Sequence, residues 1–161
     1  MSWEAGADLL VVGTGVAGMT AALRARELGL RVLVVSKDTV SAGNTGWAQG
    51  GIAVVRPDER DPEDSLEQHV QDTLAAGAGL CSRTAVREVL AGGAAAIERL
   101  RAAGARFDVG ADGALARTRE GGHSAFRVIH AGGDATGAEV QRALAEAVRA
   151  GGIPVLERPC V

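Results

Sequence analysis

Tyrosine is absent from this 161-residue chain, aromatic residues make up only 2% of it, and cysteine occurs twice. Cys81 and Cys160 lie far apart and belong to no Cys-x-x-Cys or Cys/His cluster, which argues against a disulfide framework and a zinc site. No apolar run approaches the roughly 20 residues that cross a bilayer, and no basic region followed by an apolar stretch opens the chain. We therefore expect a cytoplasmic protein with no metal and no membrane partner.

The chain also lacks a large excess of charge of one sign: its net charge is only -3, and Arg and Glu are interleaved on the presumptive helix faces. Without a basic stripe, nucleic acid is not an expected partner. Apolar residues make up 47% of the chain, the composition of a globular domain with one core.

The order of apolar runs predicts an α/β fold of the Rossmann type. Residues 7–12 form an almost continuous apolar run, as expected for a parallel strand buried on both faces. A helix follows and ends at Gly29, where a left-handed cap is wanted, and residues 30–35 form a second strand. Residues 7–36 are therefore predicted to be one βαβ core.

The remaining residues are predicted to form a loop, a helical insertion and a final helix and strand. The loop covers residues 37–55, and the insertion covers residues 61–104. Its first helix is expected to begin at Asp61-Pro62-Glu63-Asp64 and to end near Gly77, and its second to cover residues 84–103. A short strand and a turn are expected within residues 105–112, and a helix and strand within residues 134–161. Because the chain stops beside a strand, we expect an incomplete domain, truncated before a substrate-capping domain.

A dinucleotide fingerprint lies between the first strand and the first helix, in Gly13-Thr14-Gly15-Val16-Ala17-Gly18. Gly13 permits the tight turn, Gly15 lets a pyrophosphate approach the backbone, and Gly18 lets helix and strand pack closely. The helix N-terminus adds free N–H groups and a positive dipole. The alternative is a glycine-rich turn that binds nothing.

The residue that usually binds ribose, an acid about 20 residues further on, is missing. Ser36 and Lys37 occupy that region, which weakens the case for a generic NAD site. The Ser36 hydroxyl could bind a ribose oxygen, and Lys37 could lie near phosphate or be an ordinary solvated lysine.

A second glycine cluster resembles the flavin loop of the succinate dehydrogenase, fumarate reductase and L-aspartate oxidase family, which contains an Ala-Gln-Gly-Gly-Ile stretch. This resemblance implies FAD. In the respiratory members, a histidine five residues before the glutamine is linked covalently to FAD. This chain has Asn44 at that position, which implies noncovalent FAD and the aspartate oxidase branch. The cluster reads Ser41-Ala42-Gly43-Asn44-Thr45-Gly46-Trp47-Ala48-Gln49-Gly50-Gly51-Ile52-Ala53.

Residues 118–124 are similar to the substrate loop of aspartate oxidases, where the dicarboxylate dehydrogenases have an apolar residue in place of Glu120. A carboxylate there could bind the ammonium group that distinguishes L-aspartate from succinate. The other interpretation of Glu120 is a surface glutamate. His123 could bind a substrate carboxylate or make a structural hydrogen bond, whereas His69 and His130 are interpreted as structural.

The resemblance implies oxidation of L-aspartate to iminoaspartate, the first step of de novo NAD biosynthesis. It further implies dioxygen or fumarate as electron acceptor, quinolinate synthase as a possible pathway partner, and Val161 near the adenine. Little or no activity is expected from these 161 residues alone, because the family's other catalytic positions come later. Two alternatives remain open: a fumarate reductase or succinate dehydrogenase flavoprotein, and a nucleotide-binding module without catalysis.

Overall fold

The chain divides into two compact units, each of which is described here by itself. The computed structural model describes residues 6–58 and 61–158. Within these, unit 1 contains residues 6–48, 103–105 and 137–158, and unit 2 contains residues 49–58, 61–102 and 106–136. The expectation of a single core is therefore wrong, because the segment that follows the flavin loop buries apolar side chains of its own.

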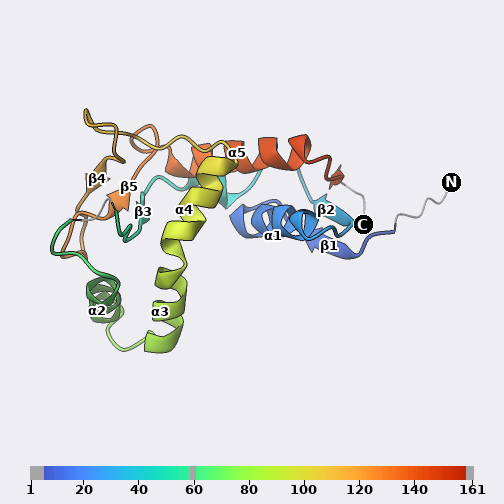
Figure 1. Cartoon of the computed structure of the whole chain (residues 1–161). Helices are drawn as coiled ribbons and strands as arrows, with labels where there is room; N and C mark the ends of the chain where they lie inside the picture. The colour runs from blue at the N-terminus through green and yellow to red at the C-terminus, as the bar shows by residue number, and fades with distance from the viewer. Residues whose placement is uncertain (1–5, 59–60, 159–161) are drawn as a thin grey trace. The chain divides into compact units, whose positions relative to one another are not determined.

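Unit 1 contains a parallel three-stranded sheet in the order β1-β2-β6 (Figure 1). Its register pairs Leu9 with Val32 and Val34 with Val155. The predicted βαβ core is confirmed, as are the final helix and strand. The elements are β1 Leu9–Val12, α1 Val16–Glu27, β2 Val32–Ser36, the 3-10 turn η1 Asn44–Trp47, α5 Thr136–Ala150 and β6 Val155–Glu157.

One face of this sheet carries the core of unit 1. Met19 and Ala22 of α1 are fully buried, as are Val34 of β2 and Val148 of α5. The expectation that the first strand is buried on both faces is wrong: Val12 is 80% exposed. The helices within unit 1 cover only one face, so alternate β1 side chains point away from the core.

Unit 2 combines three helices with an antiparallel sheet in the order β3-β5-β4. Strand β5 is central: Ile129 pairs with Ile52 and Val128 pairs with Thr118. Strands β4 and β5 form a hairpin whose connection contains most of the predicted substrate loop. The elements are β3 Ile52–Ala53, α2 Leu66–Ala76, α3 Arg83–Ala91, α4 Gly93–Ala102, β4 Arg117–Thr118 and β5 Val128–Ile129.

The predicted helical insertion is present, but the start of its first helix is wrong. Helix α2 begins after Ser65, whose hydroxyl accepts the N–H of Gln68 at 3.1 Å. Asp64, expected in the first helical turn, is instead bound to the side chain of Arg127. A tertiary ion pair therefore moves the helix start from Asp61 to Ser65.

Two further predictions in this part of the chain are also wrong. The helix expected over residues 84–103 is interrupted at Gly92, whose N–H bonds to the carbonyl of Val89 at 3.2 Å, a contact one residue shorter than the helical one. The strand expected within residues 105–112 is reduced to a single bridge between Val109 and Leu115. A turn through Gly113 leaves too few residues for a ladder.

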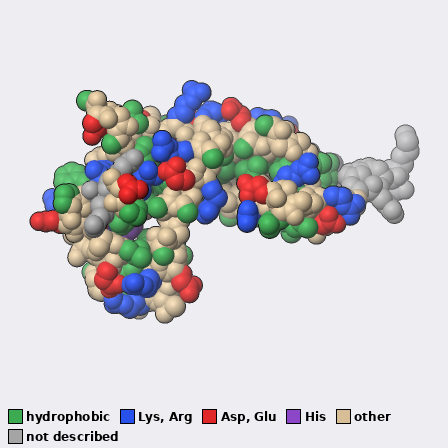
Figure 2. Space-filling view, viewed as in Figure 1, with side chains coloured by type: hydrophobic (Ala, Val, Ile, Leu, Met, Phe, Trp, Pro, Cys, Tyr) green, Lys and Arg blue, Asp and Glu red, His purple; other side chains and the backbone are tan. Residues whose placement is uncertain are grey.

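Charged side chains of both signs are interspersed on the face shown in Figure 2. Within residues 6–58 and 61–158, no helix combines the length and the apolar character needed to cross a membrane.

Candidate functional site

The dinucleotide fingerprint forms the turn that its glycines predict. Gly13 has a φ of 106°, which only glycine adopts without strain, and its N–H bonds to the carbonyl of Val35 at 2.8 Å. A Cβ at Gly18 would collide with the carbonyl oxygen of Gly13 and lie 3.3 Å from Val11 Cγ1. The third glycine therefore allows the close packing of α1 against the end of β1.

The N-terminus of α1 is suited to an anionic ligand. Its cap residue, Gly15, offers no side-chain hydrogen bond, and its first turn contains no acid. Val16 and Ala17, which follow, are exposed, so the positive end of the helix dipole lies at the surface of unit 1. These features fit the pyrophosphate of FAD.

The flavin loop reaches this helix end within unit 1. The N–H of Val16 donates to Thr45 Oγ1 at 3.0 Å, so a residue 29 positions away lies at the site expected for pyrophosphate. Asn44 and Trp47 are exposed in the same turn, η1, and Gly46 and Ala48 complete this part of the loop. The structure thus brings together the two glycine motifs that sequence analysis treated separately.

Ser36 and Lys37 differ in their surroundings at the end of β2. Ser36 is buried, and its hydroxyl lies 3.1 Å from Thr14 Oγ1, whereas Lys37 is exposed. Ser36 therefore ties the second strand to the fingerprint turn, and a role toward ribose stays a prediction. Val161 lies outside the described residues.

Gln141 of α5 is a neighbour of this turn that sequence reasoning missed. Its Nε2 donates to the carbonyls of Thr14 at 3.1 Å and Val40 at 2.7 Å. Gln141 Oε1 is buried and has no hydrogen-bond partner among the described residues. The only available signal was a polar residue on the apolar side of a predicted helix.

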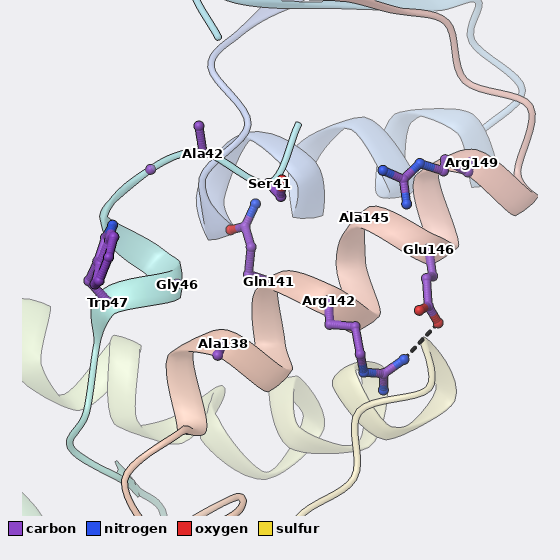
Figure 3. Close-up of a pocket in the computed structure, with 11 residues that line it drawn as sticks. Ser41, Ala42, Gly46, Trp47, Ala138, Gln141, Arg142, Ala145, Glu146 and Arg149 are labelled. Carbon is purple, nitrogen blue, oxygen red and sulfur yellow. Dashed lines mark hydrogen bonds and ion pairs between the residues drawn. The ribbon is translucent and has the colours of Figure 1, made fainter. Parts of the chain in front are cut away.

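Gln141 also lines a cavity of about 550 Å³ between the flavin loop and α5 (Figure 3). Ser41 and Trp47 lie on the loop side, and Arg142, paired with Glu146 at 2.6 Å, lies on the helix side. The fingerprint glycines do not line this cavity, so it is distinct from the pyrophosphate position.

In unit 2, the last residues of the flavin loop lead into β3. Gln49 and Gly50 are exposed, and Gly51 is tightly packed. A Cβ on Gly51 would lie 2.5 Å from the carbonyl oxygen of Ile129 and 2.7 Å from His130 Nε2. Only glycine fits here, because the neighbouring atoms include backbone that cannot move away.

Glu120 and His130 meet in a cavity of about 380 Å³ in unit 2, formed near the base of the β4–β5 hairpin. The Glu120 carboxylate lies 2.8 Å from His130 Nε2. Thr118, Asp108 and Asp134 contribute to the walls of the cavity. Glu120 lines this cavity with its side chain 46% exposed, so a ligand that enters the cavity can reach the carboxylate.

His123 lies outside this cavity, against a buried cluster of charges. Its Nδ1 is 3.3 Å from Arg127 Nη1, and its ring packs edge-on against His69 at 5.4 Å. Arg127, only 1% exposed, bonds to both oxygens of Asp64 at 3.0 and 2.6 Å and to Asp72 at 2.5 Å. These contacts support the structural interpretation of His123.

The charge cluster also anchors the end of the substrate loop. Asp72 Oδ2 accepts the backbone N–H of Ser124 at 2.9 Å and its hydroxyl at 2.8 Å. Burial alone would raise the pKa of Asp72, but the Ser124 and Arg127 hydrogen bonds hold it well below its usual range. Burial, with Arg127 nearby, lowers the pKa of His69 to about 4, so His69 is neutral at pH 7.

Asp64, Asp72 and Arg127 were not identified from the sequence. The signal was Arg127 itself, a charge inside the short apolar segment 126–129, because a buried arginine requires acidic partners. The sequence offered no means of choosing Asp64 and Asp72 among the acids of the chain. No group of His, Cys, Asp and Glu able to hold a metal occurs within the described residues.

Residues 8–160 match the FAD binding domain family. The chain is 54% identical over 159 residues to the L-aspartate oxidase of Streptomyces coelicolor, covering 99% of this chain and 27% of that protein. It is 55% identical over 147 residues to the L-aspartate oxidase of Mycobacterium bovis, covering 91% and 27%. The chain thus spans about a quarter of the length of these curated relatives.

Among solved structures, the chain is similar to the E. coli quinol fumarate reductase. The TM-score is 0.82 at 29% sequence identity, with 92% of this chain and 25% of that chain covered. The similarity supports the predicted flavoprotein fold class.

Proposed function

This chain belongs to the FAD-binding domain family, and we propose that it is the part of an L-aspartate oxidase that binds FAD and presents the substrate loop. The reaction would be oxidation of L-aspartate to iminoaspartate, the first step of de novo NAD biosynthesis. The identity to L-aspartate oxidases over nearly the whole chain supports this choice of branch.

The observation that carries the proposal is the position of Glu120. Its carboxylate lies in a cavity with the side chains of Asp108 and Asp134, a surrounding of negative charge. Such a cavity favours an ammonium group, and a carboxylate that meets it makes a charge-assisted hydrogen bond. Succinate has no group to make this bond, so Glu120 selects for the amino acid.

FAD, when bound, would supply the group that accepts a hydride from the substrate Cα. On the proposed assignment, the N-terminus of α1 and the Thr45 hydroxyl hold its pyrophosphate. Gly50, where a Cβ would meet nothing within 4 Å, would allow the backbone to approach the flavin closely, and Asn44 would leave the cofactor noncovalent.

The remaining assignments belong to the same proposal. Dioxygen or fumarate would reoxidise the flavin; the similarity to a quinol fumarate reductase supports fumarate. Quinolinate synthase would use the product, and the protein would act in the cytoplasm.

The proposal is tested in the polypeptide as its gene encodes it, purified with FAD. We expect a yellow protein that releases all its flavin on denaturation and whose bound flavin is reduced anaerobically by L-aspartate. Glu120→Gln should lower kcat/KM for L-aspartate by about 10- to 100-fold, the loss expected for a hydrogen bond between charged groups. Thr118→Val, a change in the same cavity without charge, is the matched control.

Succinate distinguishes this function from its main alternative. A wild-type protein reduced by succinate and not by L-aspartate would be a dicarboxylate dehydrogenase or fumarate reductase. If neither substrate reduced the bound flavin, the remaining interpretation would be a nucleotide-binding module without catalysis.

A further inference from the structure

His130 lies next to Gly51 of the flavin loop and next to Glu120, the residue proposed to bind the substrate. Its Nε2 is 2.8 Å from Glu120 Oε1, and the same nitrogen would be 2.7 Å from a Cβ on Gly51. Among the described residues, His130 is the one hydrogen-bond partner that the structure gives the Glu120 side chain. Gly51 and Glu120 are 69 positions apart in the sequence, and this imidazole bonds to Glu120 and fills the space that a side chain on Gly51 would need.

The position of His130 is itself constrained. It follows β5 directly, where Ile129 is fully buried and paired with Ile52 of β3. The backbone carbonyl of His130 accepts the N–H of Asp108 at 2.8 Å. Its side chain is only 18% exposed, whereas that of Glu120 is 46% exposed. The imidazole is therefore held in place by its surroundings, whereas the more exposed Glu120 side chain depends on a partner to hold its position.

The acidic side chains around the cavity have different hydrogen-bond donors. Asp108 accepts the N–H groups of Gly132 and Gly133 at 2.9 and 3.1 Å, so it holds the turn after His130. The Glu120 carboxylate has no backbone donor of this kind among the described residues. Without His130, Glu120 would be free to turn into solvent.

We propose that His130 is a positioning residue that holds Glu120 in the cavity, next to the flavin loop, for the ammonium group of the substrate. An ionised carboxylate can only accept hydrogen bonds, so His130 donates through Nε2–H. This inference rests on the proposed function and replaces the structural interpretation of His130.

The energetic reason is the rotamer freedom of glutamate. A half-exposed Glu side chain loses freedom when it binds a ligand, and a side chain that is ordered beforehand avoids that loss. Removing the donor should therefore weaken L-aspartate binding by about tenfold. Succinate, which does not use Glu120, should bind as before.

The test compares His130→Phe with His130→Gln in the polypeptide as its gene encodes it, loaded with FAD. We expect His130→Phe to raise KM for L-aspartate about tenfold, to change kcat less than twofold, and to leave the inhibition constant of succinate within twofold. His130→Gln keeps an N–H donor and should restore most of the loss. Thermal unfolding of both variants checks the fold.

A double-mutant cycle separates positioning from a general structural effect. In the Glu120→Gln background, His130→Phe should change KM by less than twofold, because the residue through which it acts no longer carries the charge. Equal effects of His130→Phe with and without Glu120 would overturn the inference, as would a parallel loss of succinate affinity. A wild-type protein that does not use L-aspartate would refute the proposed function, and this inference with it; a wild-type enzyme insensitive to His130→Phe would refute the inference alone.

Discussion

The two units of the chain are built on different interactions, although both contain predicted site residues. Unit 1 presents backbone: glycines bring α1 against β1 and leave the helix N-terminus accessible. Unit 2 presents side chains: a buried arginine and two aspartates hold the loop that carries Glu120. A backbone site requires close approach, whereas a side-chain site requires support from residues that do not themselves meet the ligand.

The difference shows where each unit is vulnerable. In unit 1 a methyl group added at Gly18 causes harm, because it would collide with the backbone carbonyl of Gly13. In unit 2 the loss of a charge causes harm, because it leaves a buried ion without its partner. Each of the following predictions challenges one side of this comparison.

The largest effect is expected from Arg127→Met. Removing the guanidinium removes the buried cation that both Asp64 and Asp72 bind, which should destabilise unit 2 by about 3–5 kcal/mol. Amide hydrogen exchange measures it: protection of Val70 and Ile129 should fall while that of Val34 in unit 1 is retained. Arg119→Met, at an exposed arginine of the same hairpin, is the control. Equal losses of protection in the two units would contradict the comparison.

A smaller effect is expected from the titration of His69. Its pKa of about 4 in the folded state lies below the ordinary value of 6.5, so the unfolded chain binds more protons between these values. The stability of unit 2 should be full above pH 6.5 and fall by up to about 3 kcal/mol as the pH drops to 4.

His69→Gln, which does not titrate, should have a flatter stability profile across this window. The direct check is an NMR titration of the His69 imidazole in the folded chain. A midpoint near 6.5 would show that the ring is not held neutral by burial and Arg127.

The smallest effect is expected from Gly18→Ala in unit 1. The new methyl group would meet the Gly13 carbonyl and push α1 away from β1, at a cost of about 1–3 kcal/mol. FAD affinity should fall in parallel, because the displaced turn is the proposed pyrophosphate site. Chemical denaturation and flavin fluorescence quenching measure the two effects.

Gly46→Ala is the matched control for stability, since a Cβ there would meet nothing within 4 Å. If the two substitutions changed the free energy of unfolding equally, close packing would not explain why glycine is required at position 18.

The sequence predicted unit 1 well because its signals are local. Strand, glycine turn and helix follow one another within residues 7–36, and each glycine acts on its immediate neighbours. The contact between Thr45 and the N–H of Val16 was not specified, but both residues had been assigned to the cofactor site. The exposure of Val12 was missed, because apolarity in a strand does not reveal how many layers cover it.

Unit 2 was predicted less well because its stabilising contacts are long-range. Asp64 and Arg127 are 63 positions apart, and their pairing displaced the helix start that local capping rules had placed at Asp61. His130 was judged structural because spacing along the chain gives no information on what an imidazole contacts.

By itself, the sequence determined the element types, the fingerprint turn, the resemblance to a flavoprotein family, and Glu120 as the residue of interest. These depend on side-chain type and short-range order, which can be read along a chain. Only the tertiary structure decided that the chain forms two units, that Asp72 anchors the substrate loop, and that His130 lies between Gly51 and Glu120. These depend on which distant residues come into contact in the folded chain, because a buried ion requires a partner of opposite charge and a close-packed interior has no room for an extra methyl group.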